Sequence, residues 1–112
     1  MEITIDGKEY TPVYNFGTLR RIGEATKQDP FTLNIDYQKP SEIYRYVHII
    51  VLAGLQSAKV SVTAKQVQET IDEWGLAQAM QVITEFNQSF AGEKNGEESP
   101  KANPFPGETS GL

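Results

Sequence analysis

Few side chains in this 112-residue sequence could perform acid–base or metal chemistry. The only histidine, His48, lies in the most apolar stretch of the chain, where a histidine is more often a hydrogen-bonded core residue than a catalyst or ligand. Asp72 and Glu73 are adjacent, so a helix would direct them to different parts of its surface. A catalytic acid and base must instead converge on one substrate. We therefore interpret the two carboxylates as a solvated face.

The sequence also lacks the residues that several common sites require. It contains no cysteine, which excludes disulfide bonds, a thiol nucleophile and a cysteine-ligated zinc site. Gly17 and Gly23 fall within a predicted helix and no Gly-Lys-Ser/Thr follows them, so no phosphate-binding loop is predicted. We expect a protein that is not an enzyme and that uses no cofactor, no metal ion and no small-molecule substrate.

The charge balance bears on the class of partner. Fifteen acidic and ten basic residues give a net charge of −5, whereas nucleic-acid-binding domains usually carry a basic surplus. Arg20 and Arg21 form a basic pair too small for a nucleic-acid footprint. The longest apolar run, Ile49 to Ala53, is far shorter than a membrane span. We expect a cytoplasmic protein that binds neither nucleic acid nor membranes.

Composition divides the chain near Gly92. The segment from 92 to 112 contains four of the nine glycines and three of the six prolines. Its apolar residues are Ala102, Phe105 and Leu112. Such a segment buries too little apolar surface to offset its conformational entropy. We predict a globular domain over residues 1–91 and a disordered tail over 92–112, for which an ordinary frayed terminus is the simplest explanation.

The predicted fold is α+β and mostly α, and it begins with a β-hairpin. Hydrophobic residues alternate with polar ones on both sides of Asp6-Gly7, a dipeptide that favours a two-residue type I′ turn. This turn would pair Ile3 with Tyr10 and place them on one face. We expect the second strand to continue to Tyr14.

About four helices are predicted to follow the hairpin. The first covers about 16–26 with Asn15 as its N-cap, the second covers 40–56, the third begins at a capping box formed by Thr63 and Gln66, and the fourth covers about 76–90. The second is apolar on almost every side, which is typical of a buried central helix. The residues expected to face inward are Phe16, Leu19, Ile22 and Ala25 in the first helix and Val67, Ile71 and Trp74 in the third. The fourth helix carries Leu76, Met80, Ile83, Phe86 and Phe90 at helical spacing.

The candidate functional residues are therefore ones that could bind a protein. In so small a domain, part of the apolar surplus of the second and fourth helices is expected to meet a partner subunit, which predicts a homo-oligomer. Tyrosine is enriched at protein interfaces. A tyrosine can equally well lie in the core with its hydroxyl group at the edge of the core. The protein-binding candidates are Tyr44, Tyr46, Met80, Ile83, Phe86 and Phe90. The last turn of the fourth helix is the stronger interface candidate, whereas its first half is expected in the core.

The order of these features resembles the tail assembly chaperones of long-tailed bacteriophages and prophages. In that family a hairpin with a Gly-Lys-x-Tyr/Phe turn precedes an aromatic residue and a helix, as Gly7-Lys8-Glu9-Tyr10 precedes Phe16 here. An apolar helix ending near Ala53-Gly54-Leu55 and the later Ile71-Asp72-Glu73-Trp74 are also similar. The resemblance covers residues 2–90. It departs at Lys27-Gln28-Asp29-Pro30, where the family often has a glycine.

The resemblance implies a non-enzymatic chaperone that coats the long helical tape-measure protein and leaves as tail tube protein polymerises around it. The expected partners are thus the tape-measure protein, the tail tube protein and further copies of the chain. Two other interpretations stay open: a structural tail or connector protein that remains in the virion, and a small cytoplasmic protein-interaction adaptor. A small enzyme or an accessory subunit of one is the least supported, because no catalytic pair is evident.

Overall fold

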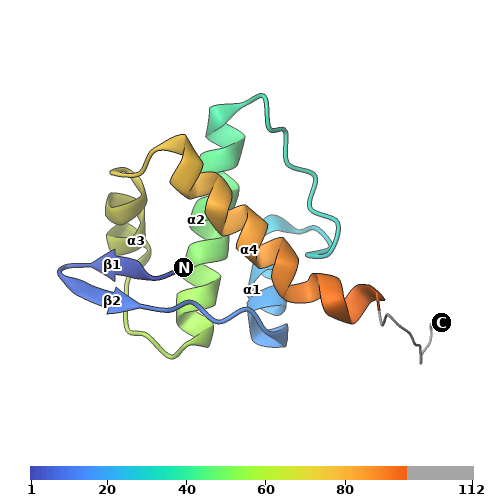
Figure 1. Cartoon of the computed structure of the whole chain (residues 1–112), viewed down its shortest axis with the longest axis horizontal. Helices are drawn as coiled ribbons and strands as arrows, with labels where there is room; N and C mark the ends of the chain where they lie inside the picture. Colours follow the sequence, from blue (N-terminus) through green and yellow to red (C-terminus); the bar gives the residue numbers. More distant parts are fainter. Residues whose placement is uncertain (96–112) are drawn as a thin grey trace.

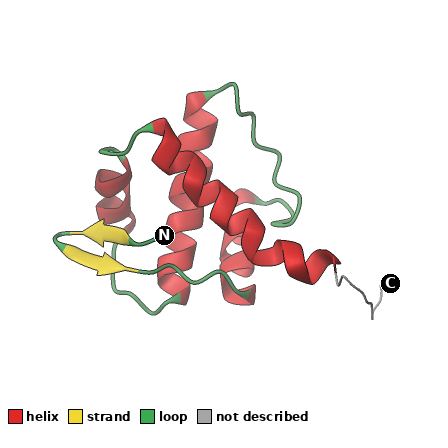
Figure 2. Ribbon diagram, in the orientation of Figure 1, coloured by secondary structure: helices red, strands yellow, loops and turns green. Residues whose placement is uncertain are grey.

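The computed structural model describes residues 1–95, with side chains described to Phe90. An N-terminal hairpin of two short strands precedes four helices (Figure 2), as the α+β, mostly α prediction required. The elements are β1 (Ile3–Ile5), β2 (Lys8–Tyr10), α1 (Phe16–Thr26), α2 (Pro40–Ser57), α3 (Ala64–Ile71) and α4 (Leu76–Asn95). The helix α4 is longer than predicted and takes in the first residues assigned to the tail. The rest of that predicted segment lies outside the described residues.

The helix α2 is the centre of the fold. Both α1 and α4 pack along it, α3 packs against it as well, and α4 runs diagonally across it (Figure 1). Val47, Ile50, Val51 and Leu55 are fully buried on its surface. The predicted central helix is thus confirmed, because its apolar residues are met from several directions within one chain. The apolar surplus that predicted a partner subunit on this helix is largely covered by the chain itself, so self-association stays a prediction.

The first helix begins where the sequence predicts. The Asn15 side chain accepts a hydrogen bond from the Thr18 backbone N–H at 3.1 Å, and Thr18 Oγ1 accepts one from the Asn15 N–H, also at 3.1 Å. Leu19 and Ile22 are buried as expected. The prediction was wrong for Phe16, which is 83 % exposed, and for Ala25, which is also exposed. Helical side chains lean toward the helix N-terminus, so the ring of a first-turn residue extends beyond the helix and away from α2.

The predicted start of α3 is also confirmed, since Thr63 and Gln66 form both hydrogen bonds of the capping box. The side chain of Trp74, predicted to face inward, is only half-buried because α3 ends three residues before it. In α4, Leu76 has the helical spacing of the apolar residues but is 65 % exposed. Leu76 is the first residue of this helix, and the core contacts of α4 lie further along it.

The hairpin has the predicted register, with Ile3 opposite Tyr10. Asp6 and Gly7 both have positive φ, 52° and 83°, as a type I′ turn requires. The prediction that the second strand continues to Tyr14 was wrong, because β2 ends at Tyr10. The chain instead crosses α2, where the Val13 N–H donates to the Gly54 carbonyl oxygen at 3.0 Å.

This crossing depends on the absence of a side chain at Gly54. A Cβ atom built there would lie 2.8 Å from the Pro12 Cβ and 3.0 Å from the Tyr14 Cε1, closer than carbon atoms pack. The chain therefore reaches α2 at backbone distance, and the next residues enter α1 directly. The fully buried Thr18 stabilises the same crossing. Its Oγ1 donates a hydrogen bond to the Val13 carbonyl oxygen at 2.6 Å and lies 2.8 Å from Ser57 Oγ.

We predict that Gly54→Ala destabilises the protein even though alanine favours a helix by about 1 kcal/mol. Overpacking against Pro12 and Tyr14 costs about 1–3 kcal/mol, so a net loss and a lower Tm are expected. Gly23→Ala is the matched control, because a Cβ there would meet Gln28 O and Pro30 Cδ at 3.5 Å, an ordinary contact. That variant should gain up to about 1 kcal/mol. Equal effects of the two substitutions in thermal unfolding would contradict the close approach.

The burial of Tyr14 at this crossing predicts that the stability of the protein depends on pH. Burial, together with the negative charge of Glu85, raises the pKa of Tyr14 from 10.0 to about 12. The unfolded chain therefore releases this proton at lower pH than the folded protein does, so stability falls as pH rises from 10 to 12, by up to about 2–3 kcal/mol from this group. The Tyr14→Phe variant lacks the titration and should lose less stability over that window. Denaturant titrations at pH 9 and pH 12 test this, and a pH-independent difference between the two proteins would refute it.

Candidate protein-binding site

An apolar cavity of about 220 Å³ opens where the start of α1 meets α4 and the connector between α1 and α2. Four of its lining residues are aromatic. We call it the aromatic pocket, and it is lined by Tyr14, Asn15, Phe16, Leu19, Phe31 and Phe90. A cavity of about 150 Å³ with apolar walls is enough to bind benzene, so this pocket has room for one aromatic or branched aliphatic side chain.

Rigid elements hold the rings of the aromatic pocket. The Tyr14 ring packs edge-on against Phe86, with ring centroids 5.7 Å apart, and Phe86 packs in the same way on Phe90 at 5.4 Å. Phe31 reaches Phe90 from the connector, at 5.8 Å and 82° between the ring planes. The backbone N–H of Phe31 donates to the Asp29 side chain at 2.9 Å, which fixes the turn that carries this ring. The pocket is thus formed before any partner binds.

The rim of the aromatic pocket exposes large apolar side chains. Phe16 is 83 % exposed and Phe31 is 44 % exposed. Sequence patterns did not indicate this site, because they placed Phe16 in the core and assigned no role to Phe31. Helical periodicity could not have revealed it, because Phe16 has the spacing of a core residue. Its position directly after the N-cap was the available signal.

Most of the protein-binding candidates from the sequence lie inside the domain. Tyr46, Ile83 and Phe86 are buried, and the Tyr46 hydroxyl accepts a hydrogen bond from Gln28 Nε2 at 2.6 Å. A partner could reach these three only if the domain opened. Phe90 is 7 % exposed, yet its ring forms part of the wall of the aromatic pocket. A charged substitution at Phe90 would therefore test folding as much as association.

The two remaining candidates lie elsewhere. Met80 is half-buried on α4, and Tyr44 is 37 % exposed on α2. Tyr44 stacks on His48 with ring centroids 6.3 Å apart, and burial followed by the charge and hydrogen bond of Asp72 raises its pKa. His48 is half-buried rather than in the core, with Nε2 3.2 Å from the Ala64 carbonyl oxygen. These contacts link α2 to α3 and account for the only histidine.

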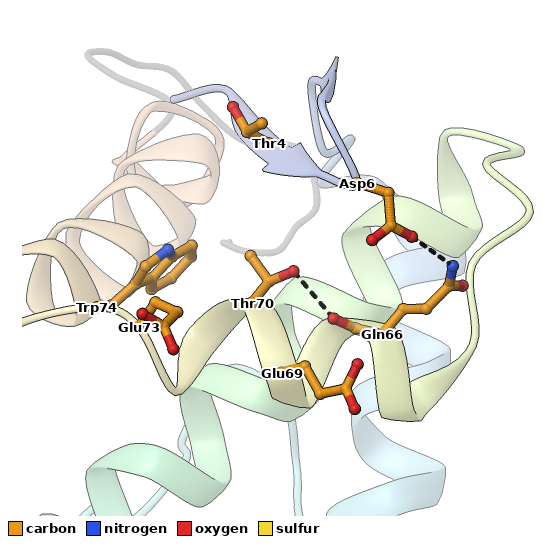
Figure 3. A pocket seen from close by; sticks show the side chains of 7 residues that line it. All are labelled: Thr4, Asp6, Gln66, Glu69, Thr70, Glu73 and Trp74. Atoms are coloured by element: carbon orange, nitrogen blue, oxygen red, sulfur yellow. Dashed lines mark hydrogen bonds between the residues drawn. The ribbon is translucent and has the colours of Figure 1, made fainter.

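A second, polar pocket of about 320 Å³ lies between the hairpin and α3. Figure 3 shows the carboxylates of Asp6, Glu69 and Glu73 around it, with the Trp74 ring at one end. The capping-box residue Gln66 donates from Nε2 to Asp6 Oδ2 at 3.0 Å and so joins the hairpin turn to α3. Within residues 1–95, no group of three or more potential ligands is placed to hold a metal ion.

The exposed acidic pair behaves as the sequence predicted. Glu73 lines the polar pocket, whereas the neighbouring Asp72 faces Tyr44 of α2. The two carboxylates diverge and do not converge on one space. Among the described helices, none is long and apolar enough to cross a membrane.

Comparison with known protein families, with curated proteins and with solved structures found no match for this chain. The resemblance to phage tail assembly chaperones thus rests on the order of sequence features alone. The aromatic pocket, with four aromatic side chains in its lining, is the candidate protein-binding site among the described residues.

Proposed function

We propose that this chain is a non-enzymatic tail assembly chaperone of a long-tailed bacteriophage or prophage, and that it binds helical segments of the tape-measure protein at the aromatic pocket. The observation that carries the proposal is the 83 % exposure of Phe16 at the rim of a preformed apolar cavity. The chaperone identity comes from the sequence resemblance, and the pocket supplies the binding surface that such a chaperone needs.

An exposed phenylalanine is costly for a domain of this size. Burying a phenylalanine side chain is worth about 1.5–3 kcal/mol relative to leaving it in water, and this chain forgoes that stabilisation at Phe16. Contiguous apolar surface on a small protein is typical of interaction sites. Phe16 and Phe31, which line the same pocket, together give such a surface, and a bound partner would recover the lost burial.

The shape of the site suits an amphipathic helix. In helix-in-groove recognition, side chains spaced three or four residues apart occupy a groove as anchors. The aromatic pocket has room for one large anchor, and the exposed rings of Phe16 and Phe31 offer contact to its neighbours one turn away. The Asn15 carboxamide oxygen at the rim already accepts the N-cap hydrogen bond. Recognition therefore relies on apolar contacts. Such contacts do not require one exact sequence, so many similar segments of a long helical partner can bind.

The net charge of −5 supports the same role. Many copies of a chaperone must remain soluble along one partner without associating through charge with nucleic acid, and a uniform negative charge favours this. The polar pocket adds to this charge on the hairpin side of the molecule, away from the aromatic rim.

We predict that Phe16→Ser weakens binding to the proposed partner, the tape-measure protein, by about 30-fold or more, since loss of an aromatic anchor costs about 2 kcal/mol. The two full-length proteins are compared by co-purification and by titration with purified partner. Phe16 is exposed, so the variant should keep the Tm of the parent. Leu76→Ser is the matched control, because Leu76 is 65 % exposed at the start of α4 but does not line the pocket.

Three binding results and two further observations decide among the interpretations. Binding by the parent and by Leu76→Ser but not by Phe16→Ser supports the proposal. Equal binding by all three proteins would show that the partner binds outside the aromatic pocket. Absence of binding by the parent would contradict the proposed chaperone function. Recovery of the protein in purified virions rather than in assembling lysates alone would favour a structural tail protein. A gene neighbourhood without a long helical reading frame would favour an adaptor.

A further inference from the structure

The aromatic pocket lies beside the point where the described chain ends. Phe90 forms one wall, and α4 continues from it to Asn95. Five helical residues advance about 7.5 Å, so residue 95 remains close to the pocket. Seventeen residues, 96 to 112, follow it in the sequence. Any apolar group among them is therefore tethered next to an apolar cavity.

Two large apolar residues occur in that segment, Phe105 and Leu112. Phe105 lies ten positions after Asn95. Ten residues span at most about 33–36 Å when extended, and a random coil of that length spans about 16–19 Å on average. Both lengths exceed the distance back to Phe90, so Phe105 can reach the pocket without strain. A tether of this length gives an effective concentration in the millimolar range, enough to populate a weak contact.

The residues around Phe105 suit an aromatic-lined site. The sequence is Asn103-Pro104-Phe105-Pro106-Gly107. A residue before proline is restricted to extended or polyproline II conformations, so both Asn103 and Phe105 lose much of their freedom before any contact forms. Preformed polyproline segments dock in grooves lined by aromatic side chains, because little conformational entropy remains to be lost. The aromatic pocket has four aromatic side chains and room for one further ring.

We propose that residues 103–107 fold back on the domain and place the Phe105 ring in the aromatic pocket, against Phe16 and Phe90. The occupant is thus a segment of the same chain. The regulatory consequence rests on the proposed function: the partner helix and the tail compete for one pocket, and a partner must displace Phe105 to bind. A pocket occupied by the tail in roughly 90 % of molecules would weaken the apparent affinity for the partner about tenfold.

The docking is tested by paramagnetic relaxation in the full-length protein. The chain has no cysteine, so Ser110→Cys gives a single attachment site for a nitroxide label. We expect selective broadening of the resonances of Phe16, Leu19 and Phe31, unchanged on dilution. Adding Phe105→Ala should remove the broadening, whereas adding Leu112→Ala should leave it. No selective broadening, or broadening that survives Phe105→Ala, would overturn the proposal, and loss on dilution would assign the contact to a second copy.

The regulatory consequence has a separate readout. Unlabelled Phe105→Ala should bind the long helical partner about two- to tenfold more tightly than the parent, and Leu112→Ala should bind like the parent. Unchanged affinity in Phe105→Ala despite positive relaxation data would overturn the competition. If the protein binds its partner but shows no relaxation effects, the proposed function stands and the proposal that the tail docks in the pocket is refuted. If the protein shows relaxation effects but binds no partner, the proposed function is refuted and the proposal that the tail docks in the pocket stands.

Discussion

The backbone-distance contact between Gly54 and the segment from Pro12 to Tyr14 is the constraint on which the rest of the structure depends. A β-carbon on this turn of α2 would collide with Pro12, so the hairpin could not pass directly over the central helix. Because it does pass, the chain enters α1 with the Asn15 cap already in place. Tyr14 is thereby set against Phe86, and Phe16 is left at the edge of the domain.

This arrangement divides the apolar residues into two groups with different roles. Those of α2 are covered by α1, α3 and α4, which leaves little of that helix to meet a partner. Those at the start of α1 lie beyond the covered region and surround a cavity that is present in the free protein. A preformed site loses little conformational entropy on binding, so modest apolar contacts can yield useful affinity. Fast exchange along a repetitive helical partner is compatible with such contacts.

The parts of the fold that sequence predicted well are those whose signals are local. Asp6-Gly7 determines the hairpin register because a two-residue turn with positive φ admits few alternatives, and Asn15 and Thr63 cap helices through bonds to residues three positions away. Phe16 was misplaced because periodicity records spacing along a helix and not where its neighbours end. The aromatic pocket was missed for a related reason: its walls come from segments up to 76 positions apart, from Tyr14 to Phe90.

The most direct test of the aromatic pocket as a binding site is a residue-resolved NMR titration of the full-length protein with a helical segment of a tape-measure protein, the partner that we propose. The account predicts that the largest chemical-shift changes fall on Phe16, Leu19 and Phe31, with Asp6 and Glu69 of the polar pocket unchanged. Changes concentrated around Tyr44 and Met80, or in the polar pocket, would contradict it.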